Sequence, residues 1–457
     1  MRESCFRRNF VFGRRPRTAG GGGGETIIPA VELLNGSVSG NTLSFTISPD
    51  KAVACAYSFY PEGVTAPEAE AILASGRQVD AESDTPVVIG DLDYSEDYVI
   101  LAAAKSRTGH IATSSLTLRT ADKFIPTFTQ PANCYIVPEA GDYSFYTETS
   151  NGSAIEGIAY VDWIWASKSD GSDADQQLLS DIALEDGIVK FTATGNRGNL
   201  VLAAFDTAGS IVWSWHIWCT ATPETRTFAN GKTFMDRNLG ATAAAPGSTD
   251  SFGLYYQWGR KDPFYGGLDV EDRGKPFTEA LKGTVVNPKY GSEWKYLFIT
   301  EGADTERSIA EPMTFFKADH YYWNSATDDD TLWGTTKTVY DPCPSGYRVP
   351  LLAELSDLLH MGEDDFDLND IGVNYVCNGL SSWFPAQGLR NPEGELECVF
   401  KYGYGSVALW TCETTAVERD GMTYHWSKRL LINEWGSLTD VYGGHRSTGL
   451  AIRCIAE

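Results

Sequence analysis

The sequence predicts a mainly β, multidomain α+β protein in which helices are short. Glycine (45 residues) and proline (20) are frequent in the 457-residue chain, and aromatic residues make up 12% of it. Such a composition favours short strands and tight turns over long helices. Apolar residues also alternate with period two, as at Leu43, Phe45 and Ile47. A chain of this length has room for about three domains, each with its own core.

Charge and hydropathy restrict the partners. Acidic residues outnumber basic ones by 61 to 36, which gives a formal charge of −25. This charge disfavours nucleic acid or an anionic membrane as partner. No stretch approaches the ~18 consecutive apolar residues of a membrane span, so we expect no transmembrane segment. Residues 1–25 form a basic, Gly-rich tail that we expect to be disordered, and no export signal is visible in it.

Residues 26–121 are predicted to form a β-sandwich with one helix. The capping-box pattern of residues 65–68 predicts a helix over residues 69–74. The apolar run from Tyr98 to Ala104 is typical of a strand buried on both faces. Leu92 lies six residues before Tyr98. This layout resembles a fibronectin type III domain, and the resemblance implies that the tyrosine makes the corner contact of a Greek key.

Residues 122–224 are predicted to form a second β-sandwich module, in which one strand has an aromatic face. Ile211, Trp213, Trp215 and Ile217 alternate in it. Packing against a core is the preferred interpretation of this face, and a sugar-stacking platform is the alternative. The opposite face carries Ser214 and His216, so we expect it to be solvated.

Residues 225–457 contain four sequence blocks in a fixed order: Thr233–Gly240 (TFMDRNLG), Gly253–Arg260 (GLYYQWGR), Asp341–Pro350 (DPCPSGYRVP) and Ile452–Ile455 (IRCI). These blocks resemble the Fibrobacter succinogenes major paralogous domain, and the two preceding modules resemble a segment that precedes such domains in surface proteins of Bacteroidota. The resemblance implies a C-type-lectin-like fold in which Cys343 and Cys454 are bonded or adjacent. A leucine stripe after Pro350 predicts a helix that ends at Gly362.

Motifs for catalysis or for metal and cofactor binding are missing from the sequence. The chain lacks Gly-x-Ser-x-Gly, a Walker loop, His-Glu-x-x-His and Cys-x-x-Cys. The calcium-dependent sugar triplets of C-type lectins are broken at Met313 and Ser325. The reactive cysteine pair of the related formylglycine-generating enzymes is also absent, because residues 441–452 contain no cysteine. We therefore predict no catalytic residue, no metal and no cofactor.

We expect a non-enzymatic, exported, cell-surface binding protein or adhesin that presents the lectin-like domain to a glycan or protein ligand. A pilus or outer-membrane anchoring partner fits this setting. The resemblance implies that the last strand, within residues 451–457, is used internally and is not lent to a neighbouring subunit, which suits a pilus tip. The alternative is a glycan-active hydrolase on a lectin-like scaffold, because 61 acidic residues leave room for a catalytic carboxylate pair.

Candidate ligand-binding residues come from loop-like settings in residues 225–457. An exposed tryptophan there can stack on a sugar or on a partner side chain, and core packing is the alternative for each ring. His445 and Arg446 lie in a Gly-rich approach to the last strand, where they can contact an acidic ligand. The candidates are Trp323, Trp383, Trp410, Trp435, His445 and Arg446.

Overall fold

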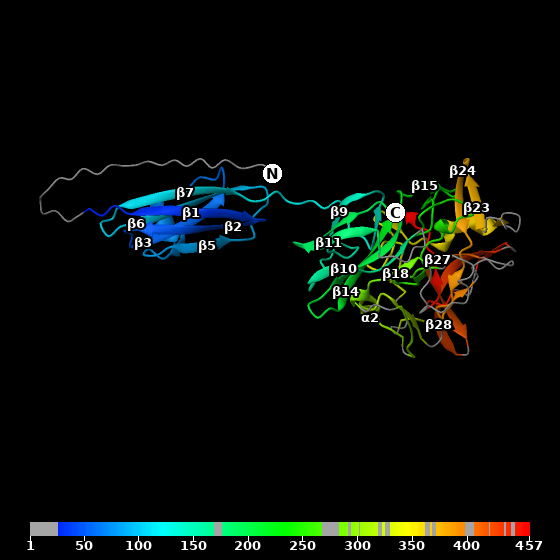
Figure 1. The fold of residues 1–457 in the computed structure, drawn as a ribbon. Helices are drawn as coiled ribbons and strands as arrows, with labels where there is room; N and C mark the ends of the chain where they lie inside the picture. The colour runs from blue at the N-terminus through cyan, green and yellow to red at the C-terminus, as the bar shows by residue number, and fades with distance from the viewer. Residues whose placement is uncertain are drawn as a thin grey trace, which may run out of the picture. The chain divides into compact units, whose positions relative to one another are not determined.

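The computed structural model divides the chain into two compact units, Met1–Ile125 and Pro126–Glu457. Figure 1 shows both units as mainly β. The predicted tail, residues 1–25, lies outside the described residues. The structure describes residues 26–168, 176–266, 283–290, 294–300, 302–318, 322–324, 330–361, 366–367, 372–397, 406–419, 421–433, 436–439 and 444–457.

The first unit is a sandwich of two antiparallel sheets. One sheet has the order β1-β2-β5 and the other β4-β3-β6-β7. Their inner faces enclose an apolar core to which β2 contributes Leu43, Phe45 and Ile47. The strands are β1 (Ala30–Ser39), β2 (Thr42–Asp50), β3 (Ala54–Pro61), β4 (Arg77–Val79), β5 (Thr85–Ile89), β6 (Asp97–Lys105) and β7 (Ile111–Arg119).

Strand β6 is covered on both sides, as its apolar run predicts. Its inner residues, including Tyr98, belong to the sandwich core, while Ala103 packs against Ile72 of helix α1 (Ala69–Ser75) on the outside. The Asp93 N–H donates a 3.1 Å hydrogen bond to the Tyr98 hydroxyl, which is the corner contact that the resemblance implies. The predicted capping box is wrong, because the helix begins one residue after Glu68 and has no side-chain cap.

The second unit begins with another sandwich. Its larger sheet has the order β18-β10-β13-β14-β8, and its smaller sheet has the order β11-β12-β9. Aromatic side chains fill the space between the sheets, with Phe145 lying edge-on to Trp215 at 5.1 Å. The strands are β8 (Cys134–Val137), β9 (Gly141–Tyr146), β10 (Tyr160–Lys168), β11 (Leu179–Glu185), β12 (Ile188–Ala193), β13 (Gly198–Phe205), β14 (Ile211–Cys219) and β18 (Thr284–Val286).

Residues 225–457, here called the C-terminal region, form several small sheets and short helices. The sheets have the orders β15-β16-β31-β21, β17-β30-β25-β26, β19-β20, β22-β23-β24 and β27-β28-β29. Their bounds are β15 (Thr225–Thr227), β16 (Thr233–Met235), β17 (Tyr256–Gln257), β19 (Lys295–Phe298), β20 (Thr314–Lys317), β21 (Tyr347–Arg348), β22 (Phe366–Asp367), β23 (Gly372–Cys377), β24 (Leu380–Pro385), β25 (Leu389–Arg390), β26 (Leu396–Glu397), β27 (Val407–Arg419), β28 (Met422–Asn433), β29 (Gly436–Thr439), β30 (Gly449–Leu450) and β31 (Ile455–Ala456). The helices are α2 (Thr305–Ala310) and the 3-10 segments η1 (Thr249–Ser251), η3 (Pro288–Tyr290) and η5 (Leu352–His360).

Helix η5 occupies the place of the predicted leucine-stripe helix. It is a 3-10 helix that buries Leu355 and Leu358, and the Arg348 guanidinium pairs with Glu354 at 2.7 Å beside it. The predicted stop at Gly362 lies outside the described residues. Among the described residues, no helix is long and apolar enough to cross a membrane.

The sandwich and the C-terminal region share one core. Strand β18, which comes from the C-terminal region, pairs with β10 at the edge of the sandwich sheet. Trp165 of β10 lies 5.1 Å from Trp294, measured between ring centroids, and Trp218 joins the same apolar cluster. The predicted boundary near residue 224 therefore falls inside a single compact unit.

This shared core corrects the expectation for the second face of β14. Ser214 and His216 are not solvated but 1% and 2% exposed. The Lys261 ammonium donates to the Ser214 hydroxyl at 2.5 Å and to Asp262 at 2.7 Å, so a buried charge pair from the C-terminal region covers this face. The alternation in the sequence correctly predicted which residues of β14 share each face. It did not predict burial of the polar face, because polar side chains can be buried when other groups supply their hydrogen bonds.

The chain ends in an interior strand. Ile455 of β31 pairs antiparallel with Phe234 of β16 on one side and with Arg348 of β21 on the other. A disulfide joins Cys343 to Cys454, with the two Cα atoms 6.0 Å apart. The other described cysteines are free thiols.

Candidate functional site

The candidate site lies on the hairpin of β27 and β28 and on a loop, residues 444–448, that lies alongside β28. Figure 1 places this hairpin at the end of the second unit away from β9 and β11. The Ser427 N–H donates to the Gly444 carbonyl at 3.1 Å, and the Gly444 N–H donates back to the Ser427 carbonyl at 2.5 Å. This antiparallel bridge fixes the loop alongside β28.

The bridge determines which side chains share a face. In an antiparallel pair, opposite residues point to the same side, and neighbours along a strand point to opposite sides. Counting outward from Ser427 and Gly444 places Trp426 with His445 on one face and His425 with Arg446 on the other. The contacts agree with this count on both faces.

The first face carries a row of three partly buried rings, Tyr424, Trp426 and His445, which we call the ring row. The Tyr424 and Trp426 ring centroids are 6.3 Å apart, and those of Trp426 and His445 are 5.8 Å apart. Tyr424 and Trp426 are two residues apart on one strand, which explains their common face. All three side chains keep some solvent exposure.

The second face carries an ion pair, which we call the ion-pair face. Arg446 donates to one carboxylate oxygen of Asp330, and the His425 imidazole Nδ1 lies 3.3 Å from the other. Partial burial raises the pKa of Asp330, but the Arg446 guanidinium and then His425 lower it more, so the pKa of Asp330 lies below its ordinary value. The Tyr322 hydroxyl accepts a 2.7 Å hydrogen bond from the backbone of His425.

A floor of buried tryptophans holds this arrangement in place. The Arg446 guanidinium lies over the Trp258 ring at 4.5 Å, and the backbone N–H of Trp258 donates to the Arg446 carbonyl at 3.2 Å. Trp410 packs directly under Gly444, where an added Cβ would meet the indole at 2.8 Å. Glycine is therefore required at this position, because any larger residue would push the loop away from the hairpin.

The tryptophans selected from the sequence are mostly core residues. Trp323 and Trp410 are 0% exposed and Trp383 is 3% exposed, so none of them can stack on a ligand. The indoles of Trp323 and Trp410 donate to the carbonyls of Trp258 and Tyr256, each at 2.7 Å. Trp435 lies outside the described residues.

The basic pair selected from the sequence is divided between the two faces. His445 is partly exposed in the ring row, whereas Arg446 is 1% exposed and held by Asp330 and Trp258. The expectation that both residues contact an acidic ligand is therefore wrong for Arg446. Sequence reasoning missed Tyr424 and Trp426, although the alternation Tyr-His-Trp over residues 424–426 was a visible signal for a strand with one aromatic face.

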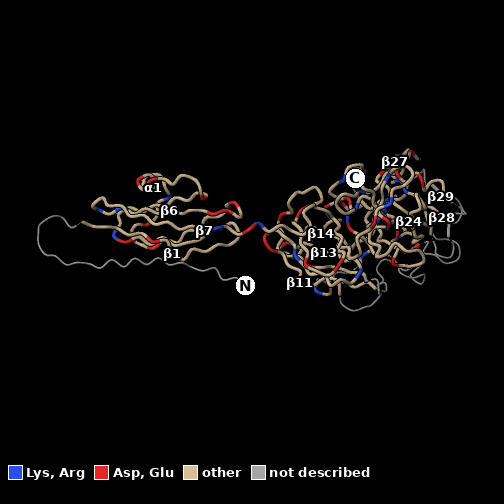
Figure 2. The backbone as a smooth tube through the Cα atoms, turned by 90° about the horizontal axis from the view of Figure 1, so that it is seen from above, with Lys and Arg blue, Asp and Glu red and all other residues tan. Residues whose placement is uncertain are grey.

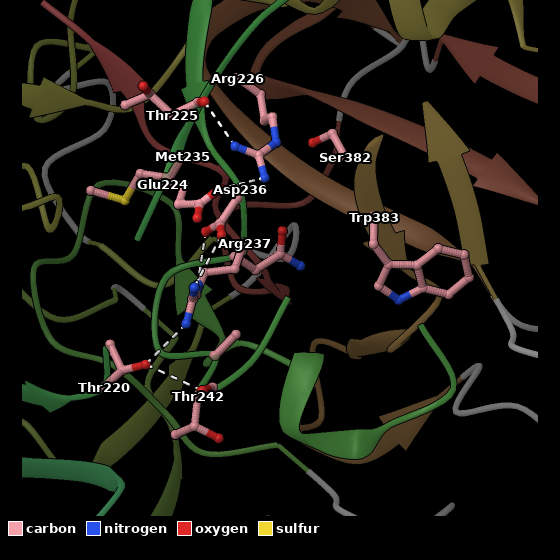
Figure 3. A network of polar contacts seen from close by, with 12 residues as sticks. Thr220, Glu224, Thr225, Arg226, Met235, Asp236, Arg237, Thr242, Ser382 and Trp383 are labelled. Carbon is pink, nitrogen blue, oxygen red and sulfur yellow. Dashed lines mark hydrogen bonds and ion pairs between the residues drawn. The ribbon is translucent and has the colours of Figure 1, made fainter. Parts of the chain in front are cut away.

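The sequence blocks that define the resemblance build buried structure. Figure 3 shows the pair Asp236–Arg237, in which the Arg237 guanidinium binds the Asp236 carboxylate at 2.8 Å and the Thr220 hydroxyl at 3.1 Å. Arg453 of the last block donates to the Asn238 side chain at 2.9 Å and to the Trp383 carbonyl at 2.6 Å. These contacts link the sandwich, the first block and the last block. The blocks therefore build the buried framework of the unit and contribute no side chain to the ring row.

Charge is dispersed over both units. Figure 2 shows acidic and basic residues interspersed along the described chain. Among the described residues, no group of three or more His, Cys, Asp or Glu side chains is placed to hold a metal ion.

Comparisons with known proteins do not identify a family for this chain. No family model matches the chain, and no curated protein matches it. Solved structures that show some similarity include the titin domains Z1Z2 in complex with telethonin, at 14% identity over 43% of this chain and 98% of that chain, with a TM-score of 0.17. The Bacteroides ovatus mixed-linkage glucan utilization locus protein SGBP-B, in complex with a mixed-linkage heptasaccharide, is 9% identical over 42% of this chain and 47% of that chain, with a TM-score of 0.15.

The chicken CNTN1 domains FN1–FN3 are 10% identical over 46% of this chain and 75% of that chain, with a TM-score of 0.17. TM-scores this low carry no argument about fold or function. The assignment of the C-terminal region to the family that its blocks resemble therefore stays a prediction.

Proposed function

We propose that this chain is a non-catalytic binding protein whose C-terminal region binds a glycan or a protein ligand on the ring row of Tyr424, Trp426 and His445. One observation carries the proposal. Three aromatic rings lie side by side with partial exposure at one end of the unit, on a strand whose opposite face is fixed by an ion pair.

Rigidity supports binding at this place. Aromatic side chains have few rotatable bonds, so they lose little conformational entropy when a ligand orders them. The bridge from Ser427 to Gly444 and the buried Trp410 beneath it fix the two segments that carry the rings. A preorganised surface of this kind retains more of its contact energy as affinity.

An extracellular, cell-surface setting is part of the proposal. A disulfide between Cys343 and Cys454 suits an oxidising compartment. β31 is paired on both sides and is not itself free for strand addition to a neighbouring subunit. A position at the tip of a pilus is part of the same proposal. A pilus or outer-membrane anchoring partner belongs to the same proposal.

The test compares two partly buried tryptophans. Trp426 lies in the ring row, and Trp163 lies on β10 of the sandwich. The full chain, Trp426→Ala and Trp163→Ala are tested for binding to glycan and cell-surface protein arrays, with turnover followed on the same samples. We expect Trp426→Ala to weaken binding by about tenfold or more, and Trp163→Ala to bind like the wild type.

Two results would contradict the proposal. Unchanged binding by Trp426→Ala would remove the ring row from the site. Release of cleaved sugar by the wild type would instead favour the alternative, a glycan-active hydrolase.

A further inference from the structure

We propose that the first unit carries a binding site of its own, a pocket at one end of the sandwich that takes a short protein segment in which a carboxylate lies next to an aliphatic side chain. This pocket belongs to a different compact unit from the ring row, and it does not depend on the function proposed for that row.

Three segments of the first unit meet around the pocket, which has a volume of about 640 Å³. They are the residues that lead into β1, the turn between β2 and β3, and the turn between β6 and β7. The first segment contributes Ile28, the second contributes Lys51, Ala52 and Val53, and the third contributes Arg107. The volume is within the range of known ligand sites, about 300–1,000 Å³.

Hydrogen bonds hold the three segments together. The Ile27 N–H donates to the Thr108 hydroxyl at 3.1 Å, and the same hydroxyl donates to the Ile27 carbonyl at 2.9 Å. The Val53 N–H donates to the Lys105 carbonyl at 2.8 Å, which ties the second segment to the end of β6. A pocket whose walls are fixed in advance loses less conformational entropy when a ligand binds.

The pocket presents aliphatic side chains to solvent. Ile28 is 70% exposed and Val53 is 56% exposed. Ala52, which also lines the pocket, belongs to the core of the sandwich. A ligand that covers these side chains removes apolar surface from water, so the pocket favours a ligand with an aliphatic part.

Two cationic side chains line the same pocket. The Lys51 ammonium lies 3.9 Å from the Asp50 carboxylate, and both side chains are more than half exposed, so this ion pair is weak. Arg107 is exposed and forms no ion pair among the described residues. A carboxylate that enters the pocket can therefore pair with either cation, and a guanidinium can hold it through two parallel hydrogen bonds.

The lining of the pocket and the charge of the chain select a protein segment among anionic ligands. The described residues that line the pocket include no aromatic ring, so the pocket lacks the flat faces on which sugar rings stack. A membrane or a nucleic acid presents many negative charges, which the formal charge of −25 repels. A short protein segment brings only a few carboxylates, and its aliphatic side chains can cover Ile28 and Val53.

The experiment titrates the full chain by calorimetry with three peptides of equal length. The first alternates Glu and Asp with Leu, the second replaces the acids by Gln and Asn, and the third replaces Leu by Ser. We expect the first peptide to bind at least about fivefold more tightly than the other two, because only it supplies both parts of the ligand. Its affinity should fall between about 50 mM and about 300 mM NaCl, since exposed charges are screened by salt.

Matched variants locate the binding. Lys51→Glu and Arg107→Glu should each weaken binding of the first peptide by about fivefold or more, because attraction becomes repulsion. Lys123→Glu makes the same charge change after β7, whereas the turn that lines the pocket precedes β7, and it should change the affinity by less than about twofold.

The aliphatic wall has its own pair of variants. Val53→Ser should weaken binding, and Val88→Ser, on the exposed side of β5, should not. The substituted side chains are all exposed, so thermal unfolding should stay close to that of the wild type.

Several results would overturn the inference. They include equal binding of the three peptides, no binding by the wild type at about 1 mM peptide, and binding that Lys51→Glu and Arg107→Glu leave unchanged. Binding to vesicles of phosphatidylserine that both variants abolish would assign the pocket to a lipid instead. Self-association in sedimentation that both variants abolish would assign it to a second copy of the chain.

The ring row is tested separately. Trp426→Ala should bind the first peptide as the wild type does. Failure of the pocket inference would therefore leave the proposed function standing, and failure of the ring row would leave the pocket.

Discussion

Strands β14 and β28 carry similar sequence patterns but have opposite surroundings. Each alternates aromatic residues with polar residues that include a histidine, as Trp213-Ser214-Trp215-His216 in β14 and as Tyr424-His425-Trp426 in β28. Both faces of β14 are buried, whereas the corresponding part of β28 keeps partial exposure on both faces. The difference shows that an aromatic alternation predicts a strand and its two faces, but not whether a face becomes core or surface.

The neighbours of each strand cause this difference. The sandwich core covers one face of β14, and the C-terminal region covers the other with Trp258, Lys261 and further buried groups. Near its turn, the described neighbours of β28 include β27, the loop at Gly444, Asp330 and the Tyr322 hydroxyl, and they leave its rings partly exposed. Burial is therefore decided by which segments arrive from far along the chain.

The largest expected effect comes from removing the sandwich strands that pack against the C-terminal region. A fragment of residues 226–457 lacks β10, β13 and β14, so it exposes the side of the shared core that they cover. We expect this fragment to be aggregated or molten, although its sequence alone predicts a separate domain of sufficient length. Circular dichroism and thermal unfolding provide the measurement.

The matched fragment is residues 126–457, which contains the entire second unit and should unfold cooperatively. A cooperative transition in the shorter fragment, with the stability of the longer one, would mean that the shared core contributes little.

The second prediction compares tryptophans on the two strands. Trp218 is 0% exposed, and its indole donates to the Ala241 carbonyl at 3.0 Å. We expect Trp218→Ala to lower the free energy of unfolding by about 3–5 kcal/mol, because a large cavity forms and a hydrogen bond is lost. Trp426→Ala should cost only about 1–2 kcal/mol, because its ring is partly exposed. Urea denaturation measures both values, and equal losses would contradict the assignment of the ring row to the surface.

The third prediction concerns how the free energy of unfolding changes at acidic pH. Burial lowers the pKa of His216 to about 3, far below its ordinary value near 6.5. Between these values the unfolded chain binds a proton at this residue and the native chain does not, so stability falls as the pH drops from about 6.5 towards about 3. The loss should reach a few kcal/mol, measured by urea unfolding across this range.

Protonation of Asp330 should cause a smaller loss of stability, in a different pH range. Its pKa is lowered in the folded state, so its contribution is present above its ordinary pKa and is lost as the pH falls below about 4. His216→Gln should flatten the stability profile between about pH 6.5 and 4. Asp330→Asn should lower the stability above about pH 4 by a constant amount and flatten the profile only below about pH 4. A wild-type profile that is flat from neutral pH to about pH 4 would contradict the burial of His216.

Local patterns predicted much of the fold. The alternation at Leu43, Phe45 and Ile47 and the apolar run from Tyr98 correspond to strands β2 and β6. Local sequence patterns predicted the candidate site less well. Exposed tryptophans were expected in loop-like settings, yet Trp323 and Trp410 are buried because distant carbonyls satisfy their indole N–H groups.

The sequence by itself determined the β character of this protein, the period-two faces of its strands and the position of a short helix after residue 68. These features depend on residues within a few positions of one another, where backbone geometry and side-chain alternation act directly. Only the tertiary structure decided that β14 is buried on both faces, that Arg446 is enclosed by Asp330 and Trp258, and that Trp426 lies beside His445. Such contacts join residues far apart in the chain, and their burial depends on the summed packing of many segments, which no local pattern encodes.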